Sequence, residues 1–236
     1  MTNAKQAAGR CAADLVEDGM TVGLGTGSTV FFTLQRLAER ISAEGISLRG
    51  VPTSIDTETK ARELGIPLAT LDEVERIALT IDGADEIDGD YQMIKGGGGA
   101  LLREKVVAKI SDRVVTVVGR DKLVERLGTT FLLPVEVVPF ALATVARAIK
   151  RLGAEPTVRL AQPGEPFVTD NGNQILDCKF ASGIADARAL ALQLSNEPGV
   201  VEHGLFIDLA TDVVIGDDSG KAELREKYGT ASDPPE

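Results

Sequence analysis

Apolar positions in the first half of the chain follow two alternating periods. Spacings of three and four, typical of amphipathic helices, occupy residues 4–16, 28–41, 54–64 and 100–110. Short apolar runs suited to buried strands lie at residues 20–24, 48–52, 77–81 and 113–118. Repeated strand–helix units of this kind predict a Rossmann-like α/β domain, in which helices cover both faces of a parallel sheet.

The pattern changes near residue 127. Residues 133–138 are strand-like and 141–152 helical, and residues 167–180 are expected to form a β-hairpin that turns at Asn171-Gly172. A helix at 184–194 and a strand at 200–206 complete a β-α-β-β-α-β order, which is typical of a smaller α+β, ferredoxin-like domain.

The chain is therefore expected to return to its main sheet after this insertion, through residues 212–215. We predict a main α/β domain formed by residues 1–128 and 207–228. The small α+β domain would comprise residues 129–206, and residues 229–236 would form a disordered tail, because they show no packing pattern.

Composition narrows the class of protein. Of the 236 residues, 43% are hydrophobic and 26% charged, as in ordinary soluble globular proteins. No apolar run reaches the roughly 18–20 residues of a membrane span, and the N-terminus lacks an apolar signal core, so a cytoplasmic protein with no membrane partner is expected. The net charge of −11 argues against a nucleic-acid partner. Cys11 and Cys178 lack the spacing of a metal site or a disulfide framework.

The segment DGADEIDGDYQMIKGGGGALLREK, residues 82–105, carries the strongest functional signal. Acidic residues follow a buried strand, and Lys95 precedes the run Gly96–Gly99. Glycines let the backbone approach a ligand closely, at an entropic cost that a fold alone has little reason to accept. Carboxylates and an ammonium group on glycine-hinged loops are the groups that proton-transfer chemistry requires.

The acidic cluster in this segment has two functional interpretations. Clustered carboxylates suit Mg²⁺ or Ca²⁺, although the spacing is not that of an EF-hand loop. Asp82 follows the predicted strand directly and so lies at the carboxyl edge of the sheet, where open α/β folds bind ligands, which favours catalytic carboxylates. Ordinary surface charge would be enough to explain Glu86 and Asp88.

Glu104 is a candidate base, because it lies about one turn into a helix that opens with glycines. The alternative is that Arg103, Glu104 and Lys105 are ordinary helix-surface residues. The only histidine, His203, falls in a strand and is expected to be structural. No serine lies in a GxSxG elbow, so neither histidine nor serine chemistry is favoured.

The segment GLGTGST at 23–29 connects the first predicted strand to a helix. Backbone N–H groups at a helix N-terminus, together with hydroxyl groups, can hold an oxyanion. Ser28 and Val30 stand where a dinucleotide-binding GxGxxG motif would need glycine, and the Walker GK[ST] is absent. A small phosphate or a sugar hydroxyl therefore fits better than a dinucleotide, and a purely structural turn is the alternative.

Taken together, these segments resemble ribose-5-phosphate isomerase of type A over nearly the whole chain. The matching segments are GLGTGST (23–29), TSIDTETKARELGIPL (53–68), DGADEID (82–88), KGGGGALLREK (95–105), LPVEVVP (133–139), TDNGNQILD (169–177) and PGVVEHGLF (198–206). Departures from the family pattern lie outside the pocket motifs, in the PTSIDT loop and at Gly99, which is often alanine.

The resemblance implies interconversion of D-ribose 5-phosphate and D-ribulose 5-phosphate, through an enediol or enediolate, in the non-oxidative pentose phosphate pathway. It implies neither a metal nor an organic cofactor. By position, Glu104 would be the base that moves a proton between C2 and C1. Asp82 and Asp85 would handle hydroxyl protons, and Lys95 with the amides of Gly96–Gly98 would support the developing negative charge.

The resemblance also implies a larger set of substrate-binding residues and a homodimer or homotetramer, with the small domain helping association. The implied set is Lys5, Thr26, Gly27, Ser28, Thr29, Asp82, Gly83, Ala84, Asp85, Lys95, Gly96, Gly97, Gly98 and Lys122. Lys5 would contact the phosphate.

Two other functions are weighed against this one. A related amino-sugar-phosphate deaminase would need a histidine in the pocket, for which His203 is poorly placed. A sugar-phosphate sensor of the repressor type would call for an attached DNA-binding module. None is expected here, because the strand–helix pattern begins almost at residue 4.

Overall fold

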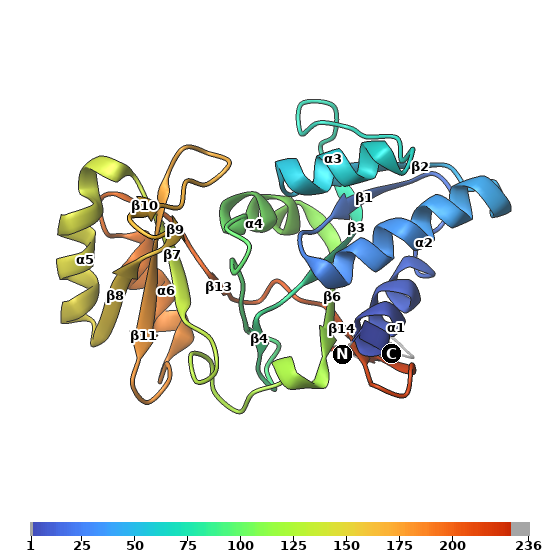
Figure 1. The fold of residues 1–236 in the computed structure, drawn as a ribbon. Helices are drawn as coiled ribbons and strands as arrows, with labels where there is room; N and C mark the ends of the chain where they lie inside the picture. The colour runs from blue at the N-terminus through green and yellow to red at the C-terminus, as the bar shows by residue number, and fades with distance from the viewer. Residues whose placement is uncertain (1, 228–236) are drawn as a thin grey trace, which may run out of the picture. The chain divides into compact units, whose positions relative to one another are not determined.

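The computed structural model of the chain describes residues 2–227, which group into two compact units (Figure 1). The first unit comprises residues 2–83, 107–121 and 208–227, and the second comprises residues 84–106 and 122–207. Residues 84–106 thus group with the small α+β region, whereas the sequence-based division assigned them to the main domain. Which unit is the catalytic domain stays a prediction, and the predicted tail at 229–236 lies outside the described residues.

The first unit is built on a six-stranded sheet, which confirms the predicted α/β fold class. The sheet has the order β15-β14-β6-β3-β1-β2 and is parallel except for β15. Its strands are β1 (Met20–Leu24), β2 (Leu48–Pro52), β3 (Ile77–Gly83), β6 (Ser111–Gly119), β14 (Asp212–Gly216) and β15 (Ala222–Glu226). Strand β15 escaped prediction because most of it is exposed, so its sequence AELRE lacks a buried apolar face.

Amphipathic helices cover this sheet. They are α1 (Thr2–Ala13), α2 (Ser28–Glu44) and α3 (Ile55–Glu63), together with the end of α4 (Leu101–Lys109), where Val107 packs beside Val51 and Ile77. Helices α1 and α2 pack against each other, and α1 also lies against β6 and β14 (Figure 1). The core contains fully buried leucines such as Leu24, Leu34 and Leu37. Burial of each leucine side chain stabilises the fold by about 1.5–3 kcal/mol.

The strand order creates a topological switch point in the first unit. The chain leaves β1 toward β2 on one side and later returns to β3 on the other side of β1. Loops at the carboxyl ends of such neighbouring strands diverge, and open α/β sheets bind ligands there. The loop after β1 and the end of β3, which carries Asp82, meet at this place. Because β3 continues two residues beyond the predicted Ile81, Asp82 belongs to the strand itself rather than following it.

The second unit contains the predicted β-α-β-β-α-β order. Its elements are β7 (Leu133–Val137), α5 (Leu142–Arg151), β8 (Ala154–Val158), β11 (Gln174–Phe180), α6 (Ala187–Ser195) and β12 (Val200–His203). The strands form an antiparallel sheet of order β12-β7-β11-β8. Both helices contribute side chains, such as Val145 and Leu190, to one buried cluster with Leu133 and Leu176, so they cover the same face of the sheet.

Shorter elements complete the second unit. A three-stranded sheet is formed by β4 (Glu86–Ile87), β5 (Met93–Ile94) and β13 (Leu205–Phe206), and β9 (Leu160–Gln162) pairs with β10 (Glu165–Pro166). Short 3₁₀ helices span Arg120–Lys122, where the two units join in the chain, and Pro139–Ala141. No helix within residues 2–227 is long and apolar enough to cross a membrane.

The predicted hairpin over residues 167–180 is wrong in its first arm. The turn forms, with Gly172 at φ 79°, but Val168 makes only an isolated bridge to Gln174. Strand β11 pairs instead with β7 on one side and with β8 on the other, and in β8 Pro156 opposes Cys178. Proline is tolerated there because β8 is an edge strand, and this proline masked the strand pattern in the sequence.

The predicted strand at 200–206 divides into two. Gly204 separates β12 from β13, and these strands belong to different sheets. A Cβ atom on Gly204 would lie 2.3 Å from the carbonyl oxygen of Lys95, so only glycine fits at the break. The backbone N–H of Lys95 donates to the Gly204 carbonyl across 2.9 Å, which ties this segment to the end of β5.

Candidate functional site

The residues selected from the sequence form two groups, one in each unit. The first unit holds Lys5, Thr26, Gly27, Ser28, Thr29, Asp82 and Gly83. The second unit holds Ala84, Asp85, Lys95, Gly96, Gly97, Gly98, Glu104 and Lys122.

In the first unit, Asp82 is held against the loop that follows β1. Its Oδ1 atom accepts hydrogen bonds from the backbone N–H groups of Thr26 (3.0 Å) and Gly83 (2.8 Å). A Cβ atom on Gly25 would lie 2.2 Å from the same oxygen. The close approach of Asp82 therefore requires glycine at position 25. The segment GLGTGST and the first residue of the 82–105 segment are thus in direct contact.

The same loop leads into α2 in a way that suits an anion. Gly27 is the N-cap residue, with φ 116° and no side-chain capping bond, so capping leaves the N–H groups of the first turn available to a ligand. The Lys5 ammonium donates to the Ser28 hydroxyl across 2.9 Å, which places a positive charge beside this helix N-terminus. This arrangement supports the anion-binding interpretation of the loop and the inclusion of Lys5, both of which stay predictions.

The Thr26 hydroxyl belongs to a hydrogen-bonded group of hydroxyls. It lies 2.8 Å from the hydroxyl of Thr53 and donates to that of Ser54 across 2.9 Å, at the N-terminus of α3. Ser54 in turn caps α3 by accepting from the backbone N–H of Thr57. The role of these hydroxyl groups in fixing the loop was not foreseen, because capping residues carry no signal for a contact with another loop.

In the second unit, Lys95 and Glu104 form a buried ion pair. The Lys95 ammonium lies 3.1 Å from Glu104 Oε1, and the two side chains are only 4% and 6% exposed. Lys95 follows β5 and Glu104 lies in the first turn of α4. The alternative that Glu104 is a helix-surface residue is therefore wrong. Burying two charges costs several kcal/mol per ion before their attraction offsets it, so such a pair is weak evidence for stability alone.

Asp85 lies beside the glycine run. Its Oδ2 atom accepts from the Gly97 backbone N–H across 2.8 Å. Burial raises the pKa of Asp85 above its usual value, and this outweighs the opposing effects of the Gly97 N–H group and of the positive charges of Lys95 and Lys122. A carboxyl group with a raised pKa exchanges a proton more readily near neutral pH, which suits a proton-transfer role.

Arg159 is a residue of this site that the sequence did not indicate. Its Nη1 atom donates to the carbonyl oxygens of Gly96 (2.8 Å) and Gly97 (3.1 Å), while its other nitrogens bind Asp177. It thereby fixes the orientation of the peptide groups in the glycine run. A single arginine about 60 residues further along the chain carries no local signal for such a contact. The only indication was that the segment TDNGNQILD, which resembles the family, ends at Asp177, the residue that Arg159 binds.

Glu86 and Asp88 are not free surface charges. Glu86 is completely buried and accepts from the backbone N–H groups of Gly128, Thr130 and Phe131. Asp88 accepts from the N–H groups two and four residues ahead and so closes the turn before β5. Within residues 2–227, no cluster of three or more His, Cys, Asp or Glu side chains has the arrangement of a metal site.

His203 is structural, as expected. Its Nε2 atom lies 3.1 Å from the Ser195 hydroxyl, and its Nδ1 atom accepts from the Leu205 backbone N–H. Burial, followed by the nearby positive charge of Lys105, lowers the pKa of His203 to about 3. The ring is therefore neutral at physiological pH.

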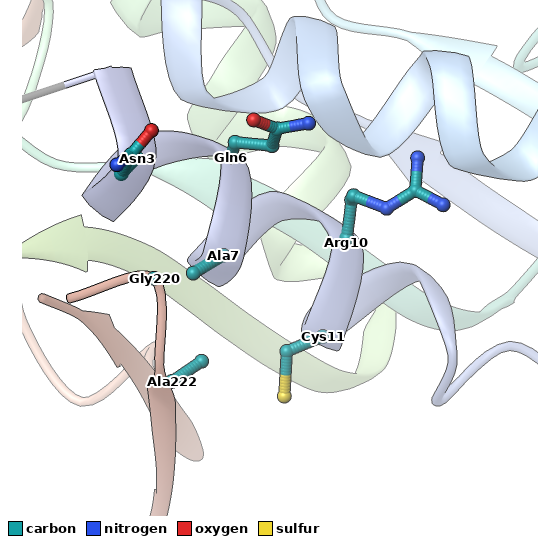
Figure 2. Close-up of a pocket in the computed structure, with 7 residues that line it drawn as sticks. All are labelled: Asn3, Gln6, Ala7, Arg10, Cys11, Gly220 and Ala222. Carbon is teal, nitrogen blue, oxygen red and sulfur yellow. The ribbon is translucent and has the colours of Figure 1, made fainter. Parts of the chain in front are cut away.

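A hollow of about 440 Å³ lies elsewhere on the first unit, between α1 and the β14–β15 hairpin (Figure 2). It contains none of the predicted site residues. Burial raises the pKa of the Cys11 thiol, so this group is a poor nucleophile, and Arg10 is already paired with Glu39. A second hollow, of about 200 Å³, is lined by Lys5 and by residues at the carboxyl ends of β6 and β14.

Comparison with known proteins decides the family. Residues 49–220 match the family model described as ribose 5-phosphate isomerase A (phosphoriboisomerase A). The chain belongs to the ribose-5-phosphate isomerase A family. It is accordingly an isomerase, as the sequence predicted. The ribose-5-phosphate isomerase A of Bacillus mycoides (strain KBAB4) is 48% identical over 223 residues, which cover 94% of this chain and all of the relative.

Solved structures of the family share the fold along almost their whole length. Ribose 5-phosphate isomerase from Plasmodium falciparum is 38% identical, with a TM-score of 0.92, over 97% of this chain and 100% of that one. A D-ribose-5-phosphate isomerase in complex with phospho-erythronic acid is 36% identical, with a TM-score of 0.90, over 94% of this chain and 97% of that one. These likenesses confirm both the suspected family and the predicted fold class.

Proposed function

We propose that this isomerase interconverts D-ribose 5-phosphate and D-ribulose 5-phosphate through an enediol or enediolate, with Glu104 as the base. The observation that carries the proposal is the buried contact between Lys95 and Glu104. A fold gains little from such a pair, whereas isomerisation needs a base and a cation close together. The family and its relatives supply the substrate class, since one solved relative holds phospho-erythronic acid.

The chemistry assigns a separate task to each group of this pair. Removal of a proton from a carbon next to a carbonyl moves negative charge onto the carbonyl oxygen. Glu104 accepts the proton from C2 and returns it to C1, and the Lys95 ammonium and the amides of Gly96–Gly98 stabilise the charged oxygen. Arg159, by fixing the peptide groups of Gly96 and Gly97, keeps those amides oriented for this purpose.

Asp82 and Asp85 are proposed to exchange hydroxyl protons, including the proton that moves when the furanose ring opens. The raised pKa of Asp85 supports this role, because its carboxyl group takes up a proton more readily than an exposed aspartate does. For Asp82, the support is positional: its Oδ1 atom accepts two backbone hydrogen bonds, which hold the carboxylate in place at the end of β3.

The remaining substrate contacts are assigned to the first-unit loop and to a few residues of the second unit. Thr26, Gly27, Ser28 and Thr29 would bind the substrate with Gly83, Ala84 and Lys122, and Lys5 would contact the phosphate. The basis for Lys5 is its ammonium beside Ser28 at the N-terminus of α2. We further propose that the enzyme works in the cytoplasm, in the non-oxidative pentose phosphate pathway, as a homodimer or homotetramer. The division into a main catalytic domain and a small domain is retained as part of this proposal.

The proposed reaction is tested by an assay without added metal. The purified protein, dialysed against a chelator, is expected to convert ribose 5-phosphate to ribulose 5-phosphate at the rate of untreated protein, because the proposed steps use only side chains and amides. Ribulose 5-phosphate formation is followed directly. Failure to form product with or without divalent cations contradicts the isomerase proposal. Activity that disappears with the chelator and returns with Mg²⁺ would instead support the metal interpretation of the acidic cluster.

A second test concerns Lys122. Replacing Lys122 with alanine is expected to raise KM for ribose 5-phosphate by roughly tenfold while kcat changes much less, since a substrate contact of this kind contributes about equally before and during reaction. Steady-state kinetics on the variant measure both constants. Lys179, an exposed lysine of β11, provides the matched control, and its alanine variant should retain the parent KM. A KM unchanged by the Lys122 substitution removes this residue from the substrate-binding set.

A further inference from the structure

The segment Glu202–Phe206 lies beside Lys95 of the Lys95–Glu104 pair but has no role in the proposed chemistry. Phe206 is 1% exposed and lies in β13, where it pairs with Met93 of β5. The Lys95 ammonium lies over its ring, 5.4 Å from the centroid. The ring face is therefore within the range of a cation–π interaction with the ammonium that contacts Glu104.

A second ammonium occupies the same ring. Lys105, the residue after Glu104 on α4, lies with its Nζ atom 4.9 Å from the Phe206 centroid. Its position is fixed by hydrogen bonds to Glu202 Oε1 (2.5 Å) and to the His203 carbonyl oxygen (2.6 Å). Each of the two ammonium groups thus contacts a carboxylate, Glu104 for Lys95 and Glu202 for Lys105.

This arrangement goes beyond what hydrophobic packing requires. A leucine or methionine at position 206 would fill a buried site at the end of β13 without attracting a cation. An aromatic ring presents a negative face, and its attraction for an ammonium grows as water is removed. Lys95 is only 4% exposed, so the ring acts where this attraction is strongest.

We propose that Phe206 is a positioning residue, whose ring holds the Lys95 ammonium beside Glu104. Lys105, clamped by Glu202 on the same ring, anchors the first turns of α4 and with them Glu104. The catalytic consequence rests on the proposed function, because Lys95 and Glu104 act on substrate only if the enzyme is the isomerase described above. The positioning itself is a property of the protein without substrate.

Fluorinated phenylalanines introduced at position 206 by site-specific incorporation test the electrostatic part of this proposal. Successive fluorine atoms withdraw electron density from the ring face while changing its size little. We expect kcat for ribose 5-phosphate to fall stepwise with each added fluorine, to about 2- to 30-fold below the parent enzyme in the most fluorinated variant. KM and the midpoint of thermal unfolding should change little, since shape and burial are retained.

A leucine substitution and a packing control complete the experiment. Phe206→Leu should lower kcat at least as much as full fluorination. Leu194→Ala, which removes a buried side chain of α6 from the same unit, should lower stability without lowering kcat at temperatures where the variant is folded. If Phe206→Leu does not fold, the fluorinated series alone decides the question. A kcat that is independent of fluorination overturns the positioning role.

A measurement without substrate separates this proposal from the proposed function. The ring of Phe206 should shift the ¹H NMR signals of the Lys95 side-chain εCH₂ group upfield, and the shift should disappear in Phe206→Leu. If the parent protein does not isomerise ribose 5-phosphate, the proposed function fails while these signals still report on positioning. If the parent is active but the Lys95 signals are the same in both proteins, the positioning proposal fails and the proposed function stands.

Discussion

Replacing Glu104 with glutamine is expected to lower kcat by about 10²–10⁴-fold, with little change in KM. Glutamine has the shape of glutamate, and its amide oxygen can still accept the hydrogen bond from Lys95 that Oε1 accepts now. The amide cannot take a proton from carbon at neutral pH, so the loss falls on the chemical step. Steady-state kinetics with ribose 5-phosphate measure both constants, and solvent-deuterium incorporation into the recovered sugar reports proton exchange directly.

The matched control for this substitution is Glu136→Gln. Glu136 is also completely buried in the second unit, where its Oε1 atom accepts from Thr169, Asn171 and Asn173. The control therefore removes a buried carboxylate charge without touching the proposed base. Turnover near the parent value in Glu104→Gln would remove Glu104 from its role. Equal losses in both variants would point to a general effect of removing buried charge.

The second large effect is expected for Lys95→Met. Methionine keeps most of the length and apolar surface of lysine but cannot donate a hydrogen bond to a developing oxyanion, which should lower kcat by about 10²–10³-fold. The same change deprives the buried Glu104 carboxylate of its ammonium partner. Breaking such a pair typically costs about 3–5 kcal/mol, so the free energy of unfolding, measured by denaturant titration, should also fall.

A double variant separates these two effects of the lysine. Lys95→Met combined with Glu104→Gln removes both charges, so much of the stability lost in the single lysine variant should return, because no unpaired charge is left. Activity should not return, since neither the base nor the oxyanion donor is present. Recovered stability together with recovered activity would contradict the proposed roles of both residues, because the double variant has neither the base nor the oxyanion donor.

Local pattern was enough to predict most of the fold, because strands and helices with one buried face repeat their apolar residues at a fixed period. Strands β1 and β2 have the predicted bounds. The pattern failed in two strands at sheet edges. Strand β8 alternates apolar and polar residues, but Pro156 argued against a strand there, and most of β15 is exposed, so it has no buried apolar face.

The candidate site was predictable where its residues lie within one segment. Lys95 and Glu104 are nine positions apart, so glycines and charges in a short stretch were enough to indicate them. Arg159 and Phe206 act on the same segment from far along the chain, and an arginine between two strands or a phenylalanine within one resembles any other. Their contacts depend on how the sheets of the second unit pair, which local periodicity does not specify.

The buried ring of His203 sets a limit on the acid tolerance of the protein. An unfolded chain binds a proton on this histidine below its ordinary pKa of 6.5, whereas the folded chain resists protonation down to about 3. The stability contributed by the neutral ring is thus fully present above pH 6.5 and is lost as the pH falls between these two values. Each pH unit in this window costs about 1.4 kcal/mol. The only histidine of the chain thereby makes the fold depend on the proton concentration around it, although it takes no part in the proposed chemistry.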